Sequence, residues 1–243
     1  LMISNEPYST YNRPMLTKSL MSELTPQQIE VEKESWYEEN RIYQVLGKEI
    51  HTIDTQNKEV VLEDGMKCRY SKLIYALGSE CFIPPIPGSD KPEVIAIRRL
   101  KDTQKIAALL PQVSNVVVIG GGVLGLEAAW ELKKARCQVT VLELAPQIMG
   151  RQLDENASQM LTAIAEGHGI SIHTGVQIEA IEGEEKVSGV RLKDGRVMEA
   201  DLVIVSAGVR ANSLLAKAAG NQINRGVVVN EKMETSLEDI YAC

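Results

Sequence analysis

The stretch from residue 116 to residue 130, Val-Val-Val-Ile-Gly-Gly-Gly-Val-Leu-Gly-Leu-Glu-Ala-Ala-Trp, constrains the fold more than any other part of the chain. An apolar run of strand length, a glycine turn and an apolar helix start follow one another without a break. Gly120 permits a tight turn, Gly122 lets the backbone approach a pyrophosphate, and Gly125 lets the helix pack closely on the sheet. The N–H groups at the helix start would face the phosphates. The pattern predicts a dinucleotide site; a glycine turn that only packs a helix on a sheet is the alternative.

A second apolar run, residues 138–142, ends at Glu143. Glu143 lies 18 positions after Gly125, close to the spacing at which a carboxylate accepts the ribose hydroxyls of an adenine nucleotide. This carboxylate disfavours a 2′-phosphate and no arginine follows it immediately, so the pattern favours NADH over NADPH. The residues expected to contact the dinucleotide here are Gly120, Gly121, Gly122, Val123, Leu124, Gly125 and Glu143.

The composition describes a globular chain and argues against several function classes. The 243 residues, 44% hydrophobic and 24% charged, are enough for one large or two small domains. A net charge of -7 argues against a nucleic-acid surface. The longest apolar stretches have the length of strands, and no charged region precedes an apolar signal segment. We therefore expect no membrane span and a cytoplasmic location.

The four cysteines, Cys68, Cys81, Cys137 and Cys243, are widely spaced. They form neither a Cys-x-x-Cys pair nor a metal-ligand pattern. We expect structural thiols, no dithiol redox centre and no bound metal. The three histidines stand singly in or beside predicted strands and loops, and none is expected to be catalytic.

A repeated pattern predicts two related units. Residues 73–78 and 202–208 are buried-type strands that end at a glycine. Each follows a short antiparallel meander with an Asp-Gly turn, at residues 64–65 and 194–195. The repeat predicts two nucleotide-binding units of the α/β class. A proline-rich segment at 82–88 marks the crossing between them.

Two further helices are predicted, one before and one after the glycine turn and its own helix. Residues 100–110 fit a helix that leads into the turn, with Asp102 or Thr103 as its N-cap. Residues 153–166 fit a second helix, which a strand at 170–173 follows.

Four short motifs together resemble one superfamily. Residues 11–18, Tyr-Asn-Arg-Pro-Met-Leu-Thr-Lys, resemble the Tyr-x-Arg-Pro-x-Leu-Ser-Lys segment of flavin reductases acting on rubredoxin or ferredoxin, and of the flavin portion of NADH-dependent nitrite reductases. Residues 73–78 resemble the Ala-Thr-Gly motif near the flavin, residues 203–212 the later strand and loop, and residues 235–243 the lead-in to a Gly-Asp pair. Over nearly its whole length the chain resembles the FAD-dependent pyridine nucleotide-disulfide oxidoreductase superfamily, in its rubredoxin reductase and nitrite reductase flavoprotein branch.

The resemblance implies two Rossmann-like, three-layer (ββα/βαβ) nucleotide-binding domains. An NAD(H)-binding domain at 93–213 is inserted into an FAD-binding domain at 1–92 and 214–243. Relative to the family, the FAD domain is truncated at both ends: its own glycine fingerprint would precede residue 1, and the Gly-Asp pair and C-terminal domain would follow residue 243. Leu77 stands where the family motif has threonine, which removes a hydroxyl but keeps the following glycine.

The resemblance also implies an activity. An NADH-dependent flavoprotein oxidoreductase passes a hydride from NADH to FAD, and electrons on to a redox partner such as rubredoxin or a nitrite reductase module. Glu127 matches a family glutamate near the nicotinamide and flavin rings, and Ala207 and Gly208 would line the nicotinamide side. Lys18 would stabilise negative charge on reduced flavin. The alternatives are a first-turn acid that stabilises the helix dipole for Glu127, and a solvated lysine for Lys18.

The resemblance also indicates which roles and partners to expect. The loop at 11–15 has no cysteine, so a thiol-based peroxidase role is not expected. The implied partner is a small electron-transfer protein or a fused reductase module, and a homodimer stays open. An NAD-binding module without catalytic activity is the alternative function. Asn5 is the alternative to Glu6 at the flavin ribose. The residues expected at FAD are Glu6, Arg13, Pro14, Lys18, Ile50, Ala76, Leu77 and Gly78.

Overall fold

The computed structural model describes residues 1–18, 20 and 25–243. The chain divides into two compact units. Unit 1 consists of Leu1–Tyr11, Pro26–Glu80 and Val209–Cys243. Unit 2 consists of Asn12–Thr25 and Cys81–Gly208.

These units do not divide the chain at the predicted domain boundaries. The domains were expected to meet at 92/93 and 213/214, whereas the compact units meet at 80/81 and 208/209. The segment Asn12–Thr25 also belongs to unit 2, although its neighbours on both sides belong to unit 1. The domain boundaries themselves stay predictions.

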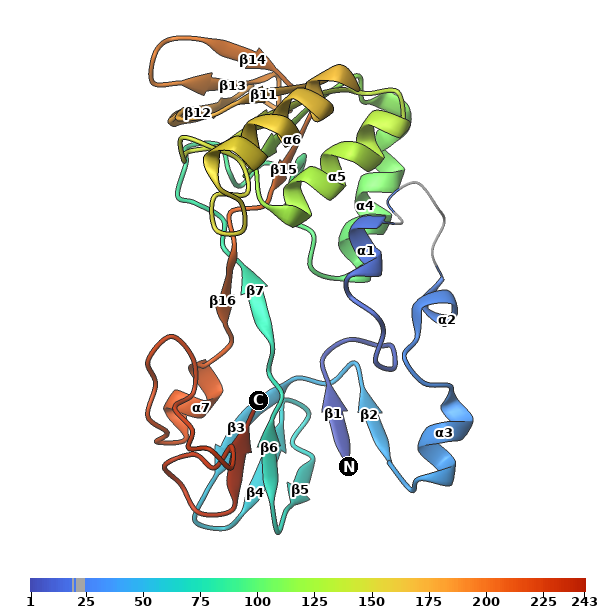
Figure 1. Ribbon diagram of the computed structural model, residues 1–243. Coiled ribbons are helices and arrows are strands. Elements are labelled where there is room, and N and C mark those ends of the chain that lie inside the picture. Colours follow the sequence, from blue (N-terminus) through green and yellow to red (C-terminus); the bar gives the residue numbers. More distant parts are fainter. Residues whose placement is uncertain (19, 21–24) are drawn as a thin grey trace. The chain divides into compact units, whose positions relative to one another are not determined.

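Unit 2 is built on a five-stranded parallel sheet with the order β11-β10-β9-β15-β8 (Figure 1). Its central strands are continuous apolar runs, as expected where both faces of a sheet are covered. Val116 and Val118 of β9 belong to one hydrophobic cluster, and Val117 and Ile119 belong to another, because successive side chains point to opposite faces. The strands are β8 (Val94–Ile95), β9 (Asn115–Ile119), β10 (Gln138–Leu142), β11 (Ile170–His173) and β15 (Leu202–Val205).

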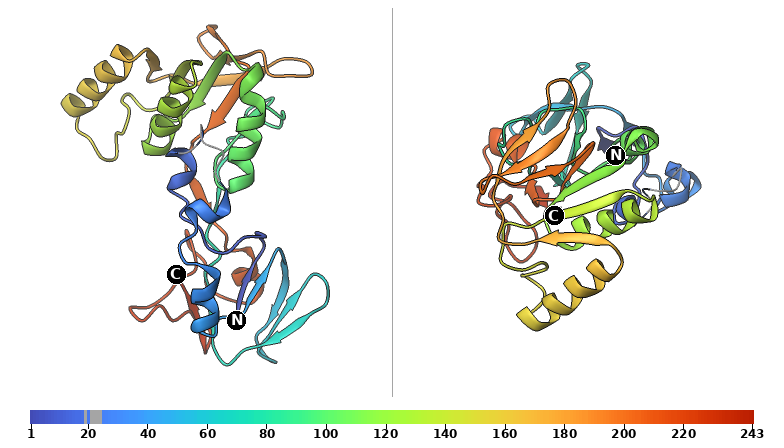
Figure 2. Two further views of the ribbon diagram at one scale, coloured as in Figure 1. Left: turned by 90° about the vertical axis from the view of Figure 1, so that its right-hand side faces the viewer. Right: turned by 90° about the horizontal axis from the view of Figure 1, so that it is seen from above.

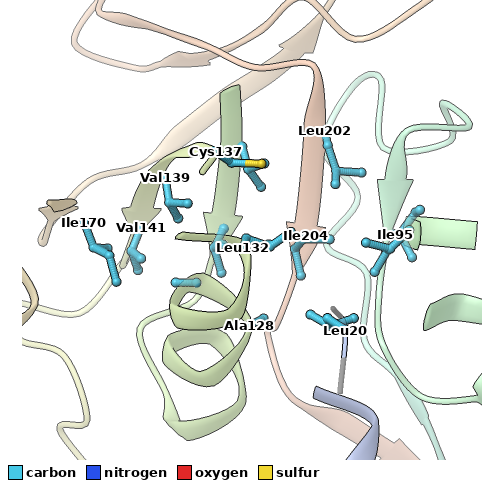
Figure 3. Packing of buried hydrophobic residues seen from close by; sticks show 14 of the residues in the cluster. Leu20, Ile95, Ala128, Leu132, Cys137, Val139, Val141, Ile170, Leu202 and Ile204 are labelled. Carbon is cyan, nitrogen blue, oxygen red and sulfur yellow. The ribbon is translucent and has the colours of Figure 1, made fainter. Parts of the chain in front are cut away.

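Helices cover one face of this sheet and an antiparallel sheet covers the other (Figures 1 and 2). Ala128 and Leu132 of α5 pack among Val139 and Ile204 of the sheet (Figure 3). The three layers confirm the predicted α/β class and Rossmann-like fold. The elements are α1 (Met15–Lys18), α4 (Leu100–Leu109), η1 (Leu110–Gln112), α5 (Val123–Lys134), α6 (Glu155–Gly167), β12 (Ile178–Glu182), β13 (Gly189–Leu192) and β14 (Val197–Glu199).

The start of α4 differs from the sequence prediction. The helix begins at Leu100, so Asp102 and Thr103 lie inside its first turn and are not the N-cap. The Asp102 carboxylate Oδ2 instead accepts hydrogen bonds from the backbone N–H groups of Arg98 at 2.9 Å and Arg99 at 2.7 Å. An acid at the third helical position can therefore accept hydrogen bonds from the backbone N–H groups just before the helix. This arrangement is one half of a capping box.

Unit 1 contains two parallel strand pairs and an antiparallel meander. β1 pairs with β2 and β6 pairs with β17, and within the described ranges no strand links the two pairs. Its core gathers Ile53, Val60, Leu62, Tyr75 and Ile240. A further pair joins β16 (Val209–Ala211) to β7 (Ser79–Cys81), whose last residue is assigned to unit 2. The other elements are β1 (Met2–Ser4), α2 (Pro26–Ile29), α3 (Glu34–Glu39), β2 (Gln44–Leu46), β3 (Ile50–Asp54), β4 (Glu59–Leu62), β5 (Lys67–Arg69), β6 (Leu73–Tyr75), α7 (Leu214–Ala218) and β17 (Ile240–Ala242).

The two antiparallel meanders repeat one another in detail. Gly65 turns β4 into β5 at φ 85°, and Gly195 turns β13 into β14 at φ 89°. Each glycine N–H donates to a leucine carbonyl three positions earlier at 3.0 Å, that of Leu62 in one unit and that of Leu192 in the other. The repeat predicted from the two Asp-Gly turns is therefore present in the structure.

Candidate dinucleotide site

The glycines between β9 and α5 have different reasons to lack a side chain. Gly120 has φ 113°, and a Cβ there would lie 2.3 Å from the carbonyl oxygen of Ser206. A Cβ on Gly125 would lie 2.0 Å from the carbonyl oxygen of Gly120. A Cβ on Gly122 would have no protein atom within 4 Å. Gly120 and Gly125 are thus required by the turn and by helix packing, whereas the protein itself does not require a glycine at position 122.

The first turn of α5 offers backbone donors. Gly122 is the N-cap, and no side-chain cap hydrogen bond is made at this helix start. Uncapped N–H groups and the positive end of the helix dipole together attract an anion. Val123 and Leu124, the first helical residues, are exposed. The open position of Gly122 leads directly to these donors.

Glu143 follows β10 and its carboxylate is held by the backbone. Oε2 accepts from the Gly121 N–H at 2.6 Å, and Oε1 accepts from the Ala145 N–H at 2.8 Å. A Cβ on Gly121 would lie 2.7 Å from Cγ2 of Ile148 and 3.2 Å from the Glu143 side chain, so Gly121 must be small. Each carboxylate oxygen has a further acceptor position. The residue can therefore accept ligand hydroxyls from a fixed position.

A cavity of about 1180 Å³ joins these features within unit 2. It lies at the carboxyl ends of β9, β10 and β15, and the strand order reverses between β9 and β15, which is where open α/β sheets bind ligands. Glu143, Arg151 and Lys193 are its charged residues. Its other lining residues are Phe82, Pro84, Ile86, Ile119, Gly120, Gly122, Leu142, Leu144, Ala145, Pro146, Gln147, Met149, Gly150, Gln152, Val176, Gln177, Ile178, Ser206, Ala207 and Gly208.

The segment after β15 also lines the cavity. The Ser206 N–H donates to the Ile119 carbonyl at 2.7 Å, and the Phe82 N–H donates to the Gly208 carbonyl at 2.9 Å. These bonds hold the residues on both sides of Ala207, which also lines the cavity. The predicted nucleotide residues at 120, 122, 143, 207 and 208 thus meet in one cavity, and its chemistry fits an extended dinucleotide.

Glu127 lies one helical turn later than the sequence suggested. Because α5 begins at Val123, Glu127 is its fifth residue and belongs to the second turn. The expectation of a first-turn acid is therefore wrong in position, and the dipole interaction decays beyond the first turn. Glu127 Oε2 accepts a hydrogen bond from the Thr17 hydroxyl at 2.9 Å. No feature of the sequence singled out Thr17, although it lies inside the motif at 11–18.

The residues expected at FAD fall in both compact units. Glu6, Ile50, Ala76, Leu77 and Gly78 belong to unit 1. The Glu6 carboxylate accepts a hydrogen bond from the Tyr11 hydroxyl. Gly78 has φ 63°, and Leu77 packs at the edge of the unit 1 core. An apolar side chain at 77 thus contributes to packing where the family motif has a threonine.

The remaining three belong to unit 2. Arg13 donates from Nη1 to the carbonyl of Arg98 at 2.8 Å. Pro14 is exposed immediately before α1, and Lys18 is the exposed last residue of that helix. Five of the predicted NAD residues therefore line one cavity, whereas Gly121, Val123, Leu124, Gly125 and Glu127 are not among its lining residues. The predicted flavin residues are distributed over two separately described units.

The buried thiol of Cys137 supports the structural interpretation of that cysteine. Burial raises the pKa of this thiol, because the charged thiolate is disfavoured away from water. All four cysteines are free. In the described part of the chain, no group of three or more His, Cys, Asp and Glu side chains could hold a metal ion. None of the described helices has the length and apolar character needed to cross a membrane.

The family model of the pyridine nucleotide-disulphide oxidoreductases matches residues 1–243. The chain belongs to this family. Proteins of the family use FAD and NAD(P)H. The sequence resemblance is therefore confirmed at the level of the family.

Two curated relatives lie in the expected branch of the pyridine nucleotide-disulphide oxidoreductases. The chain is 41% identical to the nitrite reductase [NAD(P)H] of Bacillus subtilis over 98% of its own length and 29% of that protein. It is 34% identical to the rubredoxin-NAD(+) reductase of Pseudomonas putida over 99% of its length and 63% of that protein. The chain thus spans less than two thirds of either relative.

Solved structures of the same family share the fold. A ferredoxin reductase for the CYP199A2 system from Rhodopseudomonas palustris has a TM-score of 0.93 at 31% identity, covering 99% of this chain and 60% of the other. The NADH:rubredoxin oxidoreductase of Clostridium acetobutylicum has a TM-score of 0.84 at 30% identity, covering 100% and 60%. The predicted pair of Rossmann-like units is that of this oxidoreductase family.

Proposed function

We propose that the chain is the nucleotide-binding part of an NADH-dependent flavoprotein reductase. In this function a hydride passes from NADH to FAD, and the electrons then go to a redox partner. The observation that carries the proposal is the cavity of unit 2, in which an uncapped helix start, the fixed carboxylate of Glu143 and the segment at 206–208 line one space. Membership of an oxidoreductase family supports it.

The chain's own residues have separate roles in this function. The first N–H groups of α5 hold the pyrophosphate, and Gly122 leaves room for it to approach. Glu143 accepts the hydroxyls of the adenosine ribose, and Ala207 and Gly208 line the nicotinamide side. Glu127 accepts from the nicotinamide carboxamide. FAD, when bound, supplies the ring that takes up the hydride and releases electrons.

The flavin-side assignments rest on the family resemblance and on the local chemistry of the residues. The Glu6 carboxylate, fixed by Tyr11, is suited to a ribose hydroxyl. The backbone of residues 76–78 offers a close approach, because Gly78 has no side chain. The exposed ammonium of Lys18 would favour negative charge on reduced flavin. Arg13, Pro14 and Ile50 keep their proposed contacts with FAD.

The preference for NADH over NADPH follows from competing charges in the cavity. Glu143 repels a 2′-phosphate, and its carboxylate cannot turn away without losing two backbone hydrogen bonds. Arg151 and Lys193, which the sequence did not single out, line the same cavity and attract a phosphate. Both are exposed, so solvent weakens their attraction. We propose that the fixed carboxylate dominates.

The redox partner is proposed to be a small electron-transfer protein or an attached reductase module. Relatives named for rubredoxin and nitrite support these two classes. A solved structure of putidaredoxin reductase with putidaredoxin, at TM-score 0.92 and 30% identity, supports the first class. The possible homodimer of the sequence analysis stays a prediction.

Anaerobic spectroscopy of the purified protein tests the function. We expect flavin absorbance bands that NADH bleaches. A colourless protein whose melting temperature rises with NADH would instead support the alternative, a binding module without catalysis. Protein that neither contains flavin nor responds to NADH would overturn both.

Nucleotide titrations test the cofactor preference. We expect NADH to bind at least about tenfold more tightly than NADPH, and Glu143→Ala to narrow that ratio. Glu166→Ala, an exposed acid on α6 outside the cavity lining, is the matched control. If NADH bound no better than NADPH and Glu143→Ala changed neither affinity, the assignment of Glu143 would be wrong.

A further inference from the structure

α1 is held firmly against the helices of unit 2. Leu16 and Thr17 are buried in it, and Leu20, two residues after its end, lies in the hydrophobic cluster with Ile106 and Ala128. Figure 3 shows Leu20 near Ala128. α1 also contacts α4 and α5 directly. The neighbouring side chains of α1 therefore have a defined place.

Thr17 uses this place to donate a hydrogen bond to Glu127. Its side chain is 4% exposed, and its hydroxyl lies 2.9 Å from Oε2 of Glu127. The alternative acceptor, the Pro14 carbonyl, is 3.5 Å away, beyond the usual range. A hydroxyl has one proton to donate, and a carboxylate is the stronger acceptor. The bond therefore goes to Glu127.

The carboxylate of Glu127 is consequently oriented by one neighbour. Among the residues that the structure describes, Thr17 is the only side chain that donates a hydrogen bond to it. With Oε2 engaged, Oε1 is the oxygen left for another donor. Threonine is stiff at χ1, so the donor itself is held in place.

We propose that Thr17 is a positioning residue that holds Glu127 in the orientation in which its second oxygen accepts from the nicotinamide carboxamide. The inference rests on the proposed function, which gives Glu127 that contact. It adds that a residue of the segment at 12–25 controls how the nicotinamide dinucleotide site recognises the amide. Recognition of the amide N–H is thus set by residues 110 positions apart in sequence.

A pair of dinucleotides isolates this recognition. NAD⁺ has the carboxamide N–H groups, whereas 3-acetylpyridine adenine dinucleotide has an acetyl group without them. Calorimetric dissociation constants are measured for both on the full chain. We expect the native protein to favour NAD⁺ by roughly tenfold, since one hydrogen bond to a charged acceptor is lost with the analogue.

The variants separate positioning from packing. Thr17→Val keeps the shape without the donor and should reduce the preference for NAD⁺ to roughly twofold, and Thr17→Ala should do the same. Thr17→Ser keeps the donor and should retain most of the preference. Thr103→Val, a buried threonine of α4 that donates to the Leu100 carbonyl, should leave it unchanged.

The outcomes distinguish this inference from the proposed function. If Glu127→Ala removes the preference and Thr17→Val and Thr17→Ala keep it, the positioning role of Thr17 is wrong and the role of Glu127 stands. If Glu127→Ala keeps the preference, the proposed contact of Glu127 is itself wrong. Thr17→Val could also weaken the binding of both dinucleotides by the same factor and leave the preference intact. That result would show a purely structural threonine and would overturn the proposal.

Discussion

At the scale of single residues, the glycine fingerprint was the most predictable part of the site. Turn and packing roles for Gly120 and Gly125 follow from spacing alone, because a strand-turn-helix leaves little room there. The two backbone donors that fix Glu143 did not follow from spacing. They depend on how the chain folds after β10, and no local pattern in the sequence specifies that path.

Alanine at two of these glycines should have opposite consequences. Gly125→Ala places a Cβ against the Gly120 carbonyl, so α5 must shift, and we expect a loss of about 1–3 kcal/mol in the free energy of unfolding. Gly122→Ala meets no protein atom at φ -82° and should leave that free energy nearly unchanged. It should weaken NADH binding at least about tenfold, because the Cβ occupies the approach to the helix start. Urea unfolding and NADH titration measure the two effects.

The contrast between these two variants tests the proposed roles of the glycine turn directly. Native NADH affinity in Gly122→Ala would contradict a pyrophosphate at this turn. Native stability in Gly125→Ala would contradict the close approach of α5 to the sheet.

The thiol of Cys137 gives a pH-dependent prediction. Burial raises the pKa of this thiol above its ordinary value, so the reactive thiolate forms only at a pH higher than for a free cysteine. We expect iodoacetamide to leave Cys137 unlabelled in the folded protein at pH 8 and to label it in urea, as mass spectrometry of peptides would show. Labelling of the folded protein at pH 8 at the rate of a model peptide would contradict the buried, structural thiol.

At the scale of elements, periodicity predicted which segments are helical but not how each helix begins. The helix expected at 153–166 is α6, Glu155–Gly167, with Asp154 as an N-cap that accepts from the Ala157 N–H at 2.8 Å. For α4 the same preference for an acidic cap chose the wrong position. An aspartate is favourable both at the cap and in the first turn, so composition alone cannot distinguish the two positions.

Removing the acid at the start of α4 should weaken that element. Asp102→Ala leaves the N–H groups of Arg98 and Arg99 without their acceptor, and we expect a loss of about 1 kcal/mol in the free energy of unfolding. Asp102→Asn keeps an acceptor oxygen and should lose less. Asp90→Ala, an exposed loop acid, is the control in the same urea titration. Equal stability of Asp102→Ala and Asp90→Ala would show that the two hydrogen bonds add nothing.

At the scale of the whole molecule, the repeat of Asp-Gly meander and glycine-ended strand predicted two related units, and the structure contains both. The sequence could not predict that Asn12–Thr25 belongs to unit 2. That assignment depends on the burial of Leu20 among residues far away in the chain. The Thr17–Glu127 contact was missed for the same reason.

Binding of NADH should change the rate of amide hydrogen exchange in unit 2 only. The cavity lies wholly within unit 2, so NADH should slow amide hydrogen exchange in the turn at 120–125 and the segment at 143–152. The meander of β3, β4 and β5 in unit 1 should exchange at an unchanged rate. Protection confined to the unit 1 meander would place the dinucleotide elsewhere.

The chain passes four times between the compact units, so that unit 1 is completed only by its last segment. This arrangement has a consequence for the order of folding during synthesis. The strands β9, β10 and β11 leave the ribosome one after another and pair in that order, whereas β6 must wait for β17 near residue 240. Late pairing partners delay structure formation, because a long loop must first close. The nascent chain can therefore assemble most of the dinucleotide unit while the core of unit 1 still lacks β17 and α7.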